Sequence, residues 1–301
     1  MNLKILVTGA SGLVGSHAVK ALCENGYPVT VLYRKLDQRN TKYPWDTIQG
    51  DLLDKDILRR LGSVEFDLVV HCAAVLPNQF YGDQAEQAAQ ANSLMDERII
   101  SLCLNGSRSL VYMSSTSVYG VGTGSVLTEK HDISPMGPYA AAKVESEKKI
   151  LNQLSGHSTI LRLSSPYGPG QRTRTVLQLF TERALHNLDL MYHGTGQRQQ
   201  DFIAANDVGS AIVSAISNAN TNGIFNIASG NPISMRNLAE LVVRAIPGTR
   251  SRVIPSGQPD PQDNYRAAFD ISKARRTLGW YPTVPLDEGI RRWARYLREQ
   301  E

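Results

Sequence analysis

The sequence has no apolar run long enough to cross a membrane as a helix. Nothing in its 301 residues approaches the roughly 18 uncharged apolar residues of a membrane span. The first ten residues, MNLKILVTGA, also lack the long apolar stretch and the cleavage site of a signal peptide. We therefore expect a cytoplasmic protein that makes no contact with a membrane.

Cysteines and net charge are scarce as well. The three cysteines, Cys23, Cys72 and Cys103, lie far apart in apolar segments, so we expect reduced core thiols and no metal site. His71 has no second ligand at metal spacing, and we predict a packed histidine. A net charge of +4 with dispersed arginines argues against a nucleic-acid partner but is compatible with small anionic ligands.

Short apolar runs alternate with helical patterns through the first half of the chain. Strands that alternate with helices, and that are apolar almost throughout, indicate a parallel sheet covered on both faces. The sequence thus predicts an α/β protein with a doubly wound parallel sheet. The predicted strands are 4–9, 28–33, 66–74, 109–115 and 158–164, and the predicted helices are 13–25, 54–61, 85–105 and 139–155.

Glycines follow the first predicted strand in the segment TGASGLVGS. Gly9, Gly12 and Gly15 allow a tight turn, the close approach of a diphosphate to backbone N–H groups, and close packing of helix on strand. The helix N-terminus then faces the anion. A tight turn without a ligand is the alternative, but the position after the first strand favours a dinucleotide site.

After Pro166 the pattern loosens into loops rich in Gly, Arg and Gln. Regularity returns with a helix from Asp207, a strand at 225–228, and helices near 234–246 and 286–299. We predict that residues 1–165 with 207–230 form a Rossmann-like dinucleotide-binding domain. The smaller mixed α/β substrate-binding lobe would then comprise 166–206 with 231–301.

The segment YAAAK places Tyr139 four residues before Lys143. Helical neighbours at this spacing lie about 5–6 Å apart at Cβ, so both side chains can reach one small site. An exposed pair on an amphipathic helix is the alternative. We expect the remaining charges of KVESEKK (143–149) to form a solvated face.

Motifs in the same order along nearly the whole chain resemble the short-chain dehydrogenase/reductases, and most closely their extended branch of nucleotide-sugar epimerases, dehydratases and ketoreductases. The matching segments are TGASGLVG, GDLLD (50–54), HCAA (71–74), SSTSVYG (114–120), YAAAK (139–143), LRLSSPYGPG (161–170), QDFIAANDV (200–208) and LGWYP (278–282).

The resemblance implies a catalytic trio of Ser115, Tyr139 and Lys143. Tyr139 would carry the proton during hydride transfer, Ser115 would bond the substrate oxygen, and Lys143 would acidify the phenol and hold the ribose. A free phenol has a pKa of about 10, and a nearby cation stabilises the phenolate. The implied cofactor-binding residues are Gly9, Ser11, Gly12, Leu13, Val14, Gly15, Arg34, Lys35, Asp51, Leu52, Ala73, Ala74, Lys143 and Pro166.

Residues at the end of the second strand bear on the choice of nicotinamide. Tyr33 stands where related epimerases carry an aspartate, and Arg34 and Lys35 follow it. Two cations without an acid suit a ribose 2′-phosphate, so the sequence favours NADP(H), with NAD(H) possible. A solvated basic loop is the alternative. Asp51 matches the family residue that contacts adenine.

Thr116 and Ser117 follow Ser115 where similar dehydratases carry an Asp–Glu pair. Unactivated hydroxyls are poor general acids, which leaves hydride transfer at an alcohol or ketone. The cationic strand end favours a 4-ketoreductase using NADPH. A 4-epimerase with tightly held NAD is the alternative, and a non-catalytic dinucleotide sensor is a third.

The implied substrate-binding residues are Ser165, Arg174, Gln200 and Arg266. Ser165 and Gln200 replace an asparagine and an arginine that touch the substrate diphosphate in relatives, so that grip is weakened. Arg266 remains, and Arg172, Arg174 and Arg198 could compensate. We predict a nucleotide-activated sugar as substrate, with a smaller ketone or hydroxy compound as the alternative. The resemblance also implies a homodimer through helices 85–105 and 139–155.

Overall fold

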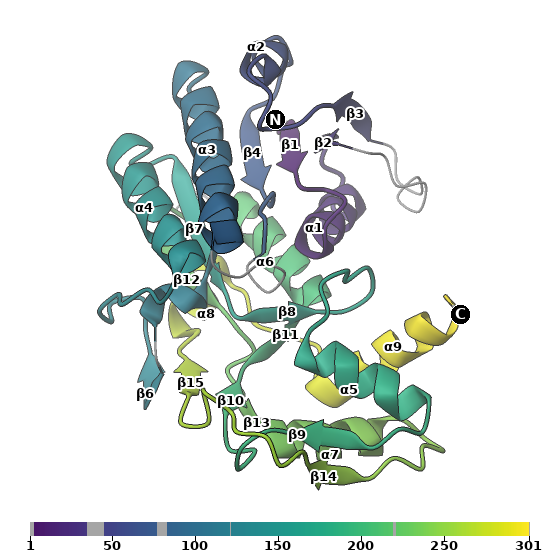
Figure 1. Ribbon diagram of the computed structural model, residues 1–301. Coiled ribbons are helices and arrows are strands. Elements are labelled where there is room, and N and C mark those ends of the chain that lie inside the picture. The colour runs from purple at the N-terminus through teal and green to yellow at the C-terminus, as the bar shows by residue number, and fades with distance from the viewer. Residues whose placement is uncertain (1–2, 35–44, 77–82, 121, 219–220, 301) are drawn as a thin grey trace.

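Seven parallel strands form the central sheet of the protein (Figure 1). The computed structural model describes residues 3–34, 45–76, 83–120, 122–218 and 221–300. The strand order is β12-β7-β5-β4-β1-β2-β3. The strand bounds are β1 Ile5–Thr8, β2 Val29–Tyr33, β3 Asp46–Gln49, β4 Leu68–His71, β5 Ser109–Ser115, β7 Ser158–Leu163 and β12 Gly223–Ile227.

Helices cover both faces of this sheet, as the predicted doubly wound fold requires. Successive strand residues point to opposite faces. Thus Val7 packs in the core under α1 and α6, while Leu6 packs in the core under α2, α3 and α4. The bounds of these helices are α1 Leu13–Glu24, α2 Ile57–Gly62, α3 Asp83–Asn105, α4 Pro138–Gln153 and α6 Ala205–Ser217. The predicted fold class is confirmed.

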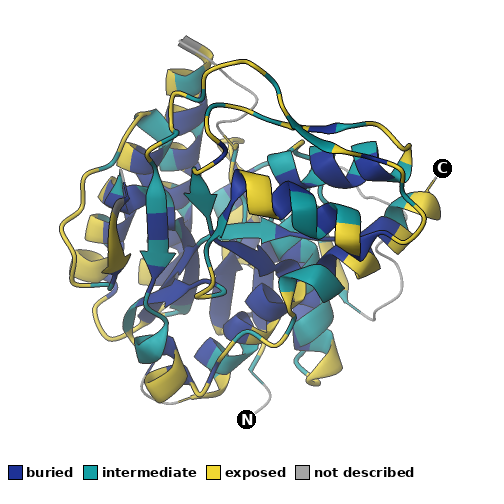
Figure 2. Ribbon diagram, turned by 90° about the horizontal axis from the view of Figure 1, so that it is seen from below, coloured by how far each residue is buried: buried dark blue, intermediate teal, exposed yellow. Residues whose placement is uncertain are grey.

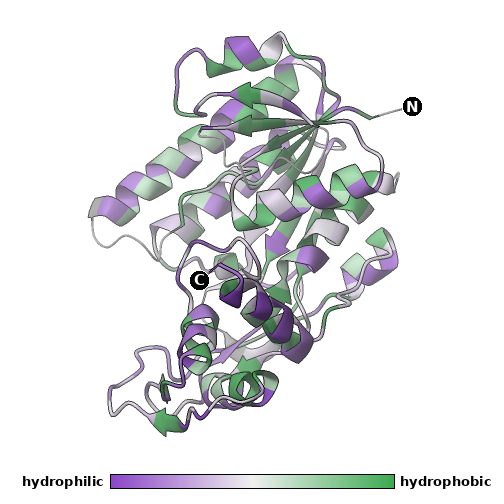
Figure 3. Ribbon diagram, turned by 90° about the vertical axis from the view of Figure 1, so that its right-hand side faces the viewer, coloured by the Kyte–Doolittle hydropathy of each residue, from purple (hydrophilic) through white to green (hydrophobic). Residues whose placement is uncertain are grey.

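A separate hydrophobic core lies below the sheet in Figure 1, among three helices: α5 Val176–Leu185, α7 Met235–Ala245 and α9 Leu286–Arg298. Phe180, Leu238 and Trp293 are buried within it. Helix α9 is hydrophilic along one side and hydrophobic on the side that it buries (Figures 2 and 3). The predicted substrate-binding lobe, 166–206 with 231–301, includes these helices and the short strands beside them.

The prediction that the chain loosens into loops after Pro166 is wrong. Helix α5 lies there, and its first turn is capped by the Thr175 hydroxyl, which accepts from the Gln178 N–H. Strands of two or three residues are too short to show an alternating pattern. They are β8 Ser165–Tyr167, β9 Leu190–Tyr192, β10 Gln199–Gln200, β11 Phe202–Ala204, β13 Ile233–Ser234 and β14 Val253–Pro255.

Strand β3 was also not predicted, because its residues are polar and mostly exposed at the sheet edge. Strand β6 (Thr123–Leu127) pairs with β15 (Arg266–Phe269), which draws the C-terminal part of the chain toward the end of β5. Helix α8 (Ser272–Leu278) follows β15. Across the residues that the structure describes, no helix has the length and apolar content of a membrane span.

Candidate active site

The strand order reverses between β1 and β4, and ligands of open α/β sheets bind beyond the carboxyl ends of the strands at such a point. Gly9 follows β1, Ala73 follows β4, and Ser115 ends β5. Pro166 lies in β8, just after β7. The structure thus brings these four predicted site residues to the carboxyl ends of the central strands.

The glycine turn leaves no room for a side chain at Gly9 or Gly15. Gly9 has φ +68°, and a Cβ added there would lie 2.6 Å from the Ala73 nitrogen. A Cβ on Gly15 would lie 2.1 Å from the Gly9 carbonyl oxygen. Helix α1 begins at Leu13, and its N-cap residue, Gly12, makes no side-chain hydrogen bond to the first turn. The first N–H groups of α1 therefore suit a diphosphate.

Within that turn, Ser11, Leu13 and Val14 are partly buried. At the next strand ends, Leu52 is buried, Ala73 is partly buried and Ala74 is exposed. These positions suit walls of a dinucleotide site, and their roles remain predictions.

The end of β2 differs from the sequence-based picture, in which no acid accompanied the two cations. The Asp51 carboxylate lies 3.8 Å from the Arg34 guanidinium and is thus beside the strand end. Asp51 also accepts a hydrogen bond from the Leu53 N–H. Lys35 lies outside the described residues. The argument for a 2′-phosphate therefore loses much of its support.

Tyr139 and Lys143 lie in the first two turns of α4, and the Lys143 ammonium is 6.0 Å from the centre of the Tyr139 ring. Lys143 is only 2% exposed and donates a hydrogen bond to the Tyr112 hydroxyl at 2.9 Å. Burial, and then the negative charge of Asp96, raise the pKa of Tyr139. The pKa of Tyr139 is thus raised, and the lowering by Lys143 that the sequence led us to expect is not found. Sequence reasoning named only the lysine, because Asp96 is distant along the chain.

The expected solvated face of KVESEKK is wrong in part. Ser146 and Glu147 are buried together with Lys143, and the Glu147 carboxylate binds the Arg162 guanidinium through two hydrogen bonds. On the exposed side of α4, Glu145 pairs with Lys148, and Lys149 pairs with Glu97 of α3.

Ser115 ends β5 and caps the short 3₁₀ helix Thr116–Tyr119. Its hydroxyl oxygen accepts two hydrogen bonds, from the Ser117 N–H at 3.1 Å and from the Ser117 hydroxyl at 2.9 Å. The Ser115 hydrogen is then available for another acceptor. This arrangement suits donation to the oxygen of a substrate.

Asp96 is the polar group at the site that sequence reasoning missed. Its carboxylate accepts hydrogen bonds from the Tyr112 hydroxyl at 2.5 Å and the Ser146 hydroxyl at 2.7 Å, and lies 2.9 Å from Nε2 of His71. One signal was present in the sequence: Asp96 interrupts an apolar helical stripe continued by Ile99, Ile100 and Cys103. His71 is packed and hydrogen-bonded, as predicted.

Hydrogen bonds connect Ser165, Gln200 and Arg266, either directly or through the adjacent residues Gln199 and Tyr265. The Gln200 amide donates to the Ser165 hydroxyl at 2.5 Å, and the Gln199 N–H donates to the Tyr265 carbonyl beside Arg266. Arg266 itself donates to the backbone carbonyls of Asp263 and Tyr265. Arg174 is exposed and pairs with Glu182 of α5.

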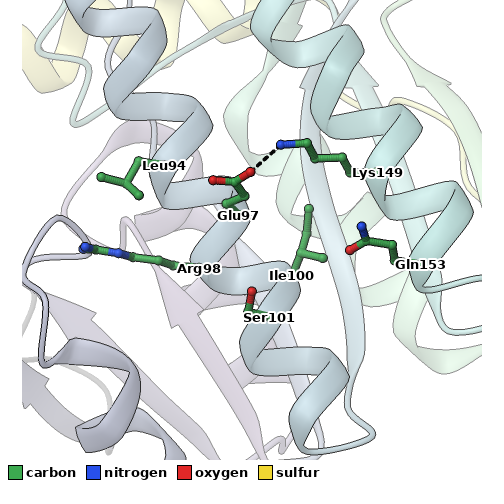
Figure 4. A pocket seen from close by; sticks show the side chains of 7 residues that line it. All are labelled: Leu94, Glu97, Arg98, Ile100, Ser101, Lys149 and Gln153. Carbon is green, nitrogen blue, oxygen red and sulfur yellow. Dashed lines mark hydrogen bonds and ion pairs between the residues drawn. The ribbon is translucent and has the colours of Figure 1, made fainter.

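Away from the catalytic edge, α3 and α4 form a surface hollow, in which Glu97 and Lys149 make an ion pair at 2.5 Å (Figure 4). The side chains that line it are Leu94, Glu97, Arg98, Ile100, Ser101, Lys149 and Gln153. Among the described residues, no cluster of three His, Cys, Asp or Glu side chains could hold a metal ion.

The glycine turn at the switch point, Ser115 at the end of β5 and the Tyr139–Lys143 pair of α4 match the arrangement expected from the resemblance to the short-chain dehydrogenase/reductases. A model of the NAD dependent epimerase/dehydratase family matches residues 5–228. The chain belongs to this family, which confirms the predicted extended branch.

Known proteins resemble the chain over nearly its whole length. It is 30% identical over 304 residues to a putative UDP-glucose 4-epimerase of Methanocaldococcus jannaschii, with 98% of each chain covered. The UDP-glucose 4-epimerase of Thermotoga maritima, solved with UDP-glucose, superposes with a TM-score of 0.90 at 26% identity over 99% of both chains. The Thermus thermophilus UDP-glucose 4-epimerase, solved with NAD, has a TM-score of 0.86 at 28% identity, covering 98% of this chain and 99% of that one.

Proposed function

We propose that this enzyme is a nucleotide-sugar 4-epimerase that retains NAD. The observation that carries the proposal is the set of Ser115, Tyr139 and Lys143 at the carboxyl end of the sheet. Ser115 is followed in the chain by Thr116 and Ser117 and not by ionisable groups. Such a site supports hydride transfer at an alcohol but lacks the acid and base that elimination of water needs. The two relatives solved with ligands that are described above are UDP-glucose 4-epimerases.

Each residue of the trio has a separate task in this proposal. Tyr139 takes the proton from the sugar 4-hydroxyl and later returns it to the 4-keto oxygen. Ser115 donates its hydroxyl hydrogen to that same sugar oxygen. This hydrogen is available because the Ser115 oxygen already accepts two hydrogen bonds from Ser117. Lys143 stabilises the phenolate by its charge. A nicotinamide held over the glycine turn would supply the hydride chemistry in both directions, and no external reductant would be consumed.

NAD is favoured over NADP because the Asp51 carboxylate lies near Arg34. A 2′-phosphate would place a second negative charge close to that carboxylate, whereas a free ribose hydroxyl would not. The solved epimerase from Thermus thermophilus holds NAD.

A 4-ketoreductase that uses NADPH is the second candidate. Arg34 favours it, because its side chain is 75% exposed and remains able to pair with a phosphate. Turnover would then consume one NADPH for each keto-sugar reduced.

The substrate in this proposal is a nucleoside diphosphate sugar held between the sheet edge and the smaller lobe. Arg266 would supply the charge for the diphosphate. Ser165 and Gln200 bond each other and offer only neutral groups, so affinity for the diphosphate would be lower than with a second arginine.

The test is to denature the purified protein, identify the nucleotide released, and incubate native protein with UDP-glucose or UDP-galactose without added cofactor. We expect released NAD and interconversion of the two sugars, detected by NMR. Bound NADP, or consumption of NADPH with a 4-keto-sugar, would establish the reductase instead. Released nucleotide of neither kind, and no turnover, would contradict both candidates.

Tyr139→Phe completes this test by removing the proton carrier while keeping the ring. We expect the rate to fall by about 10²- to 10⁴-fold with bound nucleotide retained. Tyr281→Phe, at a tyrosine 58% exposed, is the matched control and should leave the rate unchanged. An undiminished rate in Tyr139→Phe would argue for the non-catalytic alternative.

A further inference from the structure

A buried carboxylate lies next to Lys143, and the only effect described for it so far is on the pKa of Tyr139. Asp96, in the middle of α3, is 2% exposed, and its Oδ2 is 3.9 Å from the Nζ of Lys143, which is equally buried. Taking a carboxylate and an ammonium out of water is costly unless each has partners. The position of this pair beside Tyr139 suggests a purpose beyond packing.

Hydrogen bonds from three elements fix the Asp96 carboxylate. The donors are the Tyr112 hydroxyl of β5, the Ser146 hydroxyl of α4 and Nε2 of His71 at the end of β4. Thr8, the residue before the glycine turn, lies 2.6 Å from the other ring nitrogen of His71. A neutral His71 that accepts from Thr8 and donates to Asp96 satisfies both contacts.

Asp96 is therefore ionised at any working pH. Burial raises the pKa of its carboxyl group, but the Lys143 charge and the hydrogen bonds from His71 and Tyr112 outweigh burial and lower the pKa to about 2. The Tyr112 hydroxyl also connects the two charges, because it accepts from Lys143 at 2.9 Å and donates to Asp96.

Other ionisable groups around Lys143 do not replace this counter-charge. Glu147 of α4 is engaged with Arg162 of β7. Burial raises the pKa of the Cys72 thiol, at the end of β4, to about 12, which keeps it neutral. Burial likewise raises the pKa of Tyr139. Among the described residues, Asp96 is thus the carboxylate next to Lys143 whose negative charge is not paired with an arginine.

We propose that Asp96 is a positioning residue that acts through Lys143: it keeps the buried ammonium protonated and holds it where it can act on Tyr139. The physical reason is that burial alone favours the neutral amine, whereas an opposite charge within about 4–6 Å favours the ammonium. Its catalytic consequence rests on the proposed function, but its electrostatic consequence does not.

The direct test measures the titration of Lys143 in the full chain. Protein labelled with ¹³C at lysine Cε is titrated by NMR, and Lys143→Met identifies the signal. In Asp96→Asn, which keeps the shape of the side chain, we expect the midpoint of Lys143 to fall by about 1 to 3 pH units. An unmoved midpoint, or one that rises, would overturn the proposal.

Glu97→Gln is the matched control, because Glu97 is the next residue of α3 but its side chain is 55% exposed and pairs with Lys149 (Figure 4). This variant should leave the Lys143 midpoint in place. A shift equal to that of Asp96→Asn would show a general charge effect and would also count against the proposal.

A second readout is the pH profile of kcat/KM for sugar interconversion. In Asp96→Asn, the alkaline limb should move to lower pH by a similar amount, with a rate at low pH within about threefold of the wild type. A loss that is uniform at all pH values would indicate only a structural role and would contradict the inference. If wild-type protein shows no interconversion, the proposed function fails while the NMR titration still decides the role of Asp96.

Tyr112→Phe serves if Asp96→Asn does not fold. It removes the hydroxyl that bonds both charges and keeps the ring that lies 4.4 Å from the Lys143 ammonium. The Lys143 midpoint should fall in the same direction, by a smaller amount. An unchanged midpoint in this variant would refute the proposal.

Discussion

Gly15 is the position in the glycine turn where an added Cβ would come closest to another backbone atom, and its substitution tests the turn directly. In Gly15→Ala, the new Cβ would lie 2.1 Å from the Gly9 carbonyl oxygen, so backbone must shift. We expect a loss of about 1–3 kcal/mol in the free energy of unfolding, as in overpacked cores, together with loss of bound nucleotide. Urea unfolding and absorbance of the released nucleotide measure the two effects.

Gly62→Ala is the control for that prediction. Gly62 ends α2, and a Cβ there meets no described atom within 4 Å. Stability should stay the same or rise slightly, since alanine restricts the unfolded chain. If both variants lose stability equally, the close approach in the glycine turn is not the cause.

Residues that act through local sequence could be predicted, and those that act through distant contacts could not. Gly9, Tyr139 and Lys143 belong to short motifs whose spacing already implies their geometry. The sequence marks Asp96 only as a charge that interrupts an apolar helical stripe, and its partners are on β4, β5 and α4, far from it along the chain. The Asp51 carboxylate likewise reaches Arg34 across two adjacent strands, which the order of residues does not reveal.

Among the secondary-structure elements, α4 combines the proposed catalytic pair, Tyr139 and Lys143, with an ion pair that ties the helix to the sheet. Glu147 accepts from Arg162 of β7 at 2.9 and 2.6 Å and from the Ser114 hydroxyl of β5 at 2.6 Å. Both charged side chains are at most 3% exposed. The orientation of α4, and therefore of Tyr139, depends on this contact.

Glu147→Gln should destabilise the protein by about 3–5 kcal/mol, because it leaves the Arg162 guanidinium buried without its counter-charge. Urea denaturation followed by circular dichroism measures the loss. Glu145→Gln, two residues earlier in an exposed pair with Lys148, should change stability by only about 0–1 kcal/mol. Equal effects in the two variants would refute a special role for the buried pair.

Elements with strong periodicity were predictable, and short or polar elements were not. The residues of β7 are all buried, and its apolar run was evident in the sequence. Strand β3 is polar at an edge, and β10 has only two residues, so neither has a pattern to detect. Helix α4 was placed correctly, but its buried charges face partners on other elements and so appeared to be a solvated face.

The molecule as a whole has an outer surface on α3 and α4 that we propose as the interface of a homodimer. Leu94 and Leu104 of α3 are 40% and 43% exposed, and Leu94 lines the hollow between the two helices (Figure 4). Exposed leucines on paired helices favour association with a second copy, because burying their apolar surface is favourable.

Leu94→Glu tests this interface, since it places a charge at the centre of the proposed contact. We expect the wild-type protein to scatter light as twice the chain mass and Leu94→Glu to scatter as a single chain. Leu188→Glu, at a leucine 49% exposed in the smaller lobe, should remain a dimer because its surface lies away from α3 and α4. A wild-type protein with the mass of one chain, or a Leu94→Glu variant that stays dimeric, would rule out this interface.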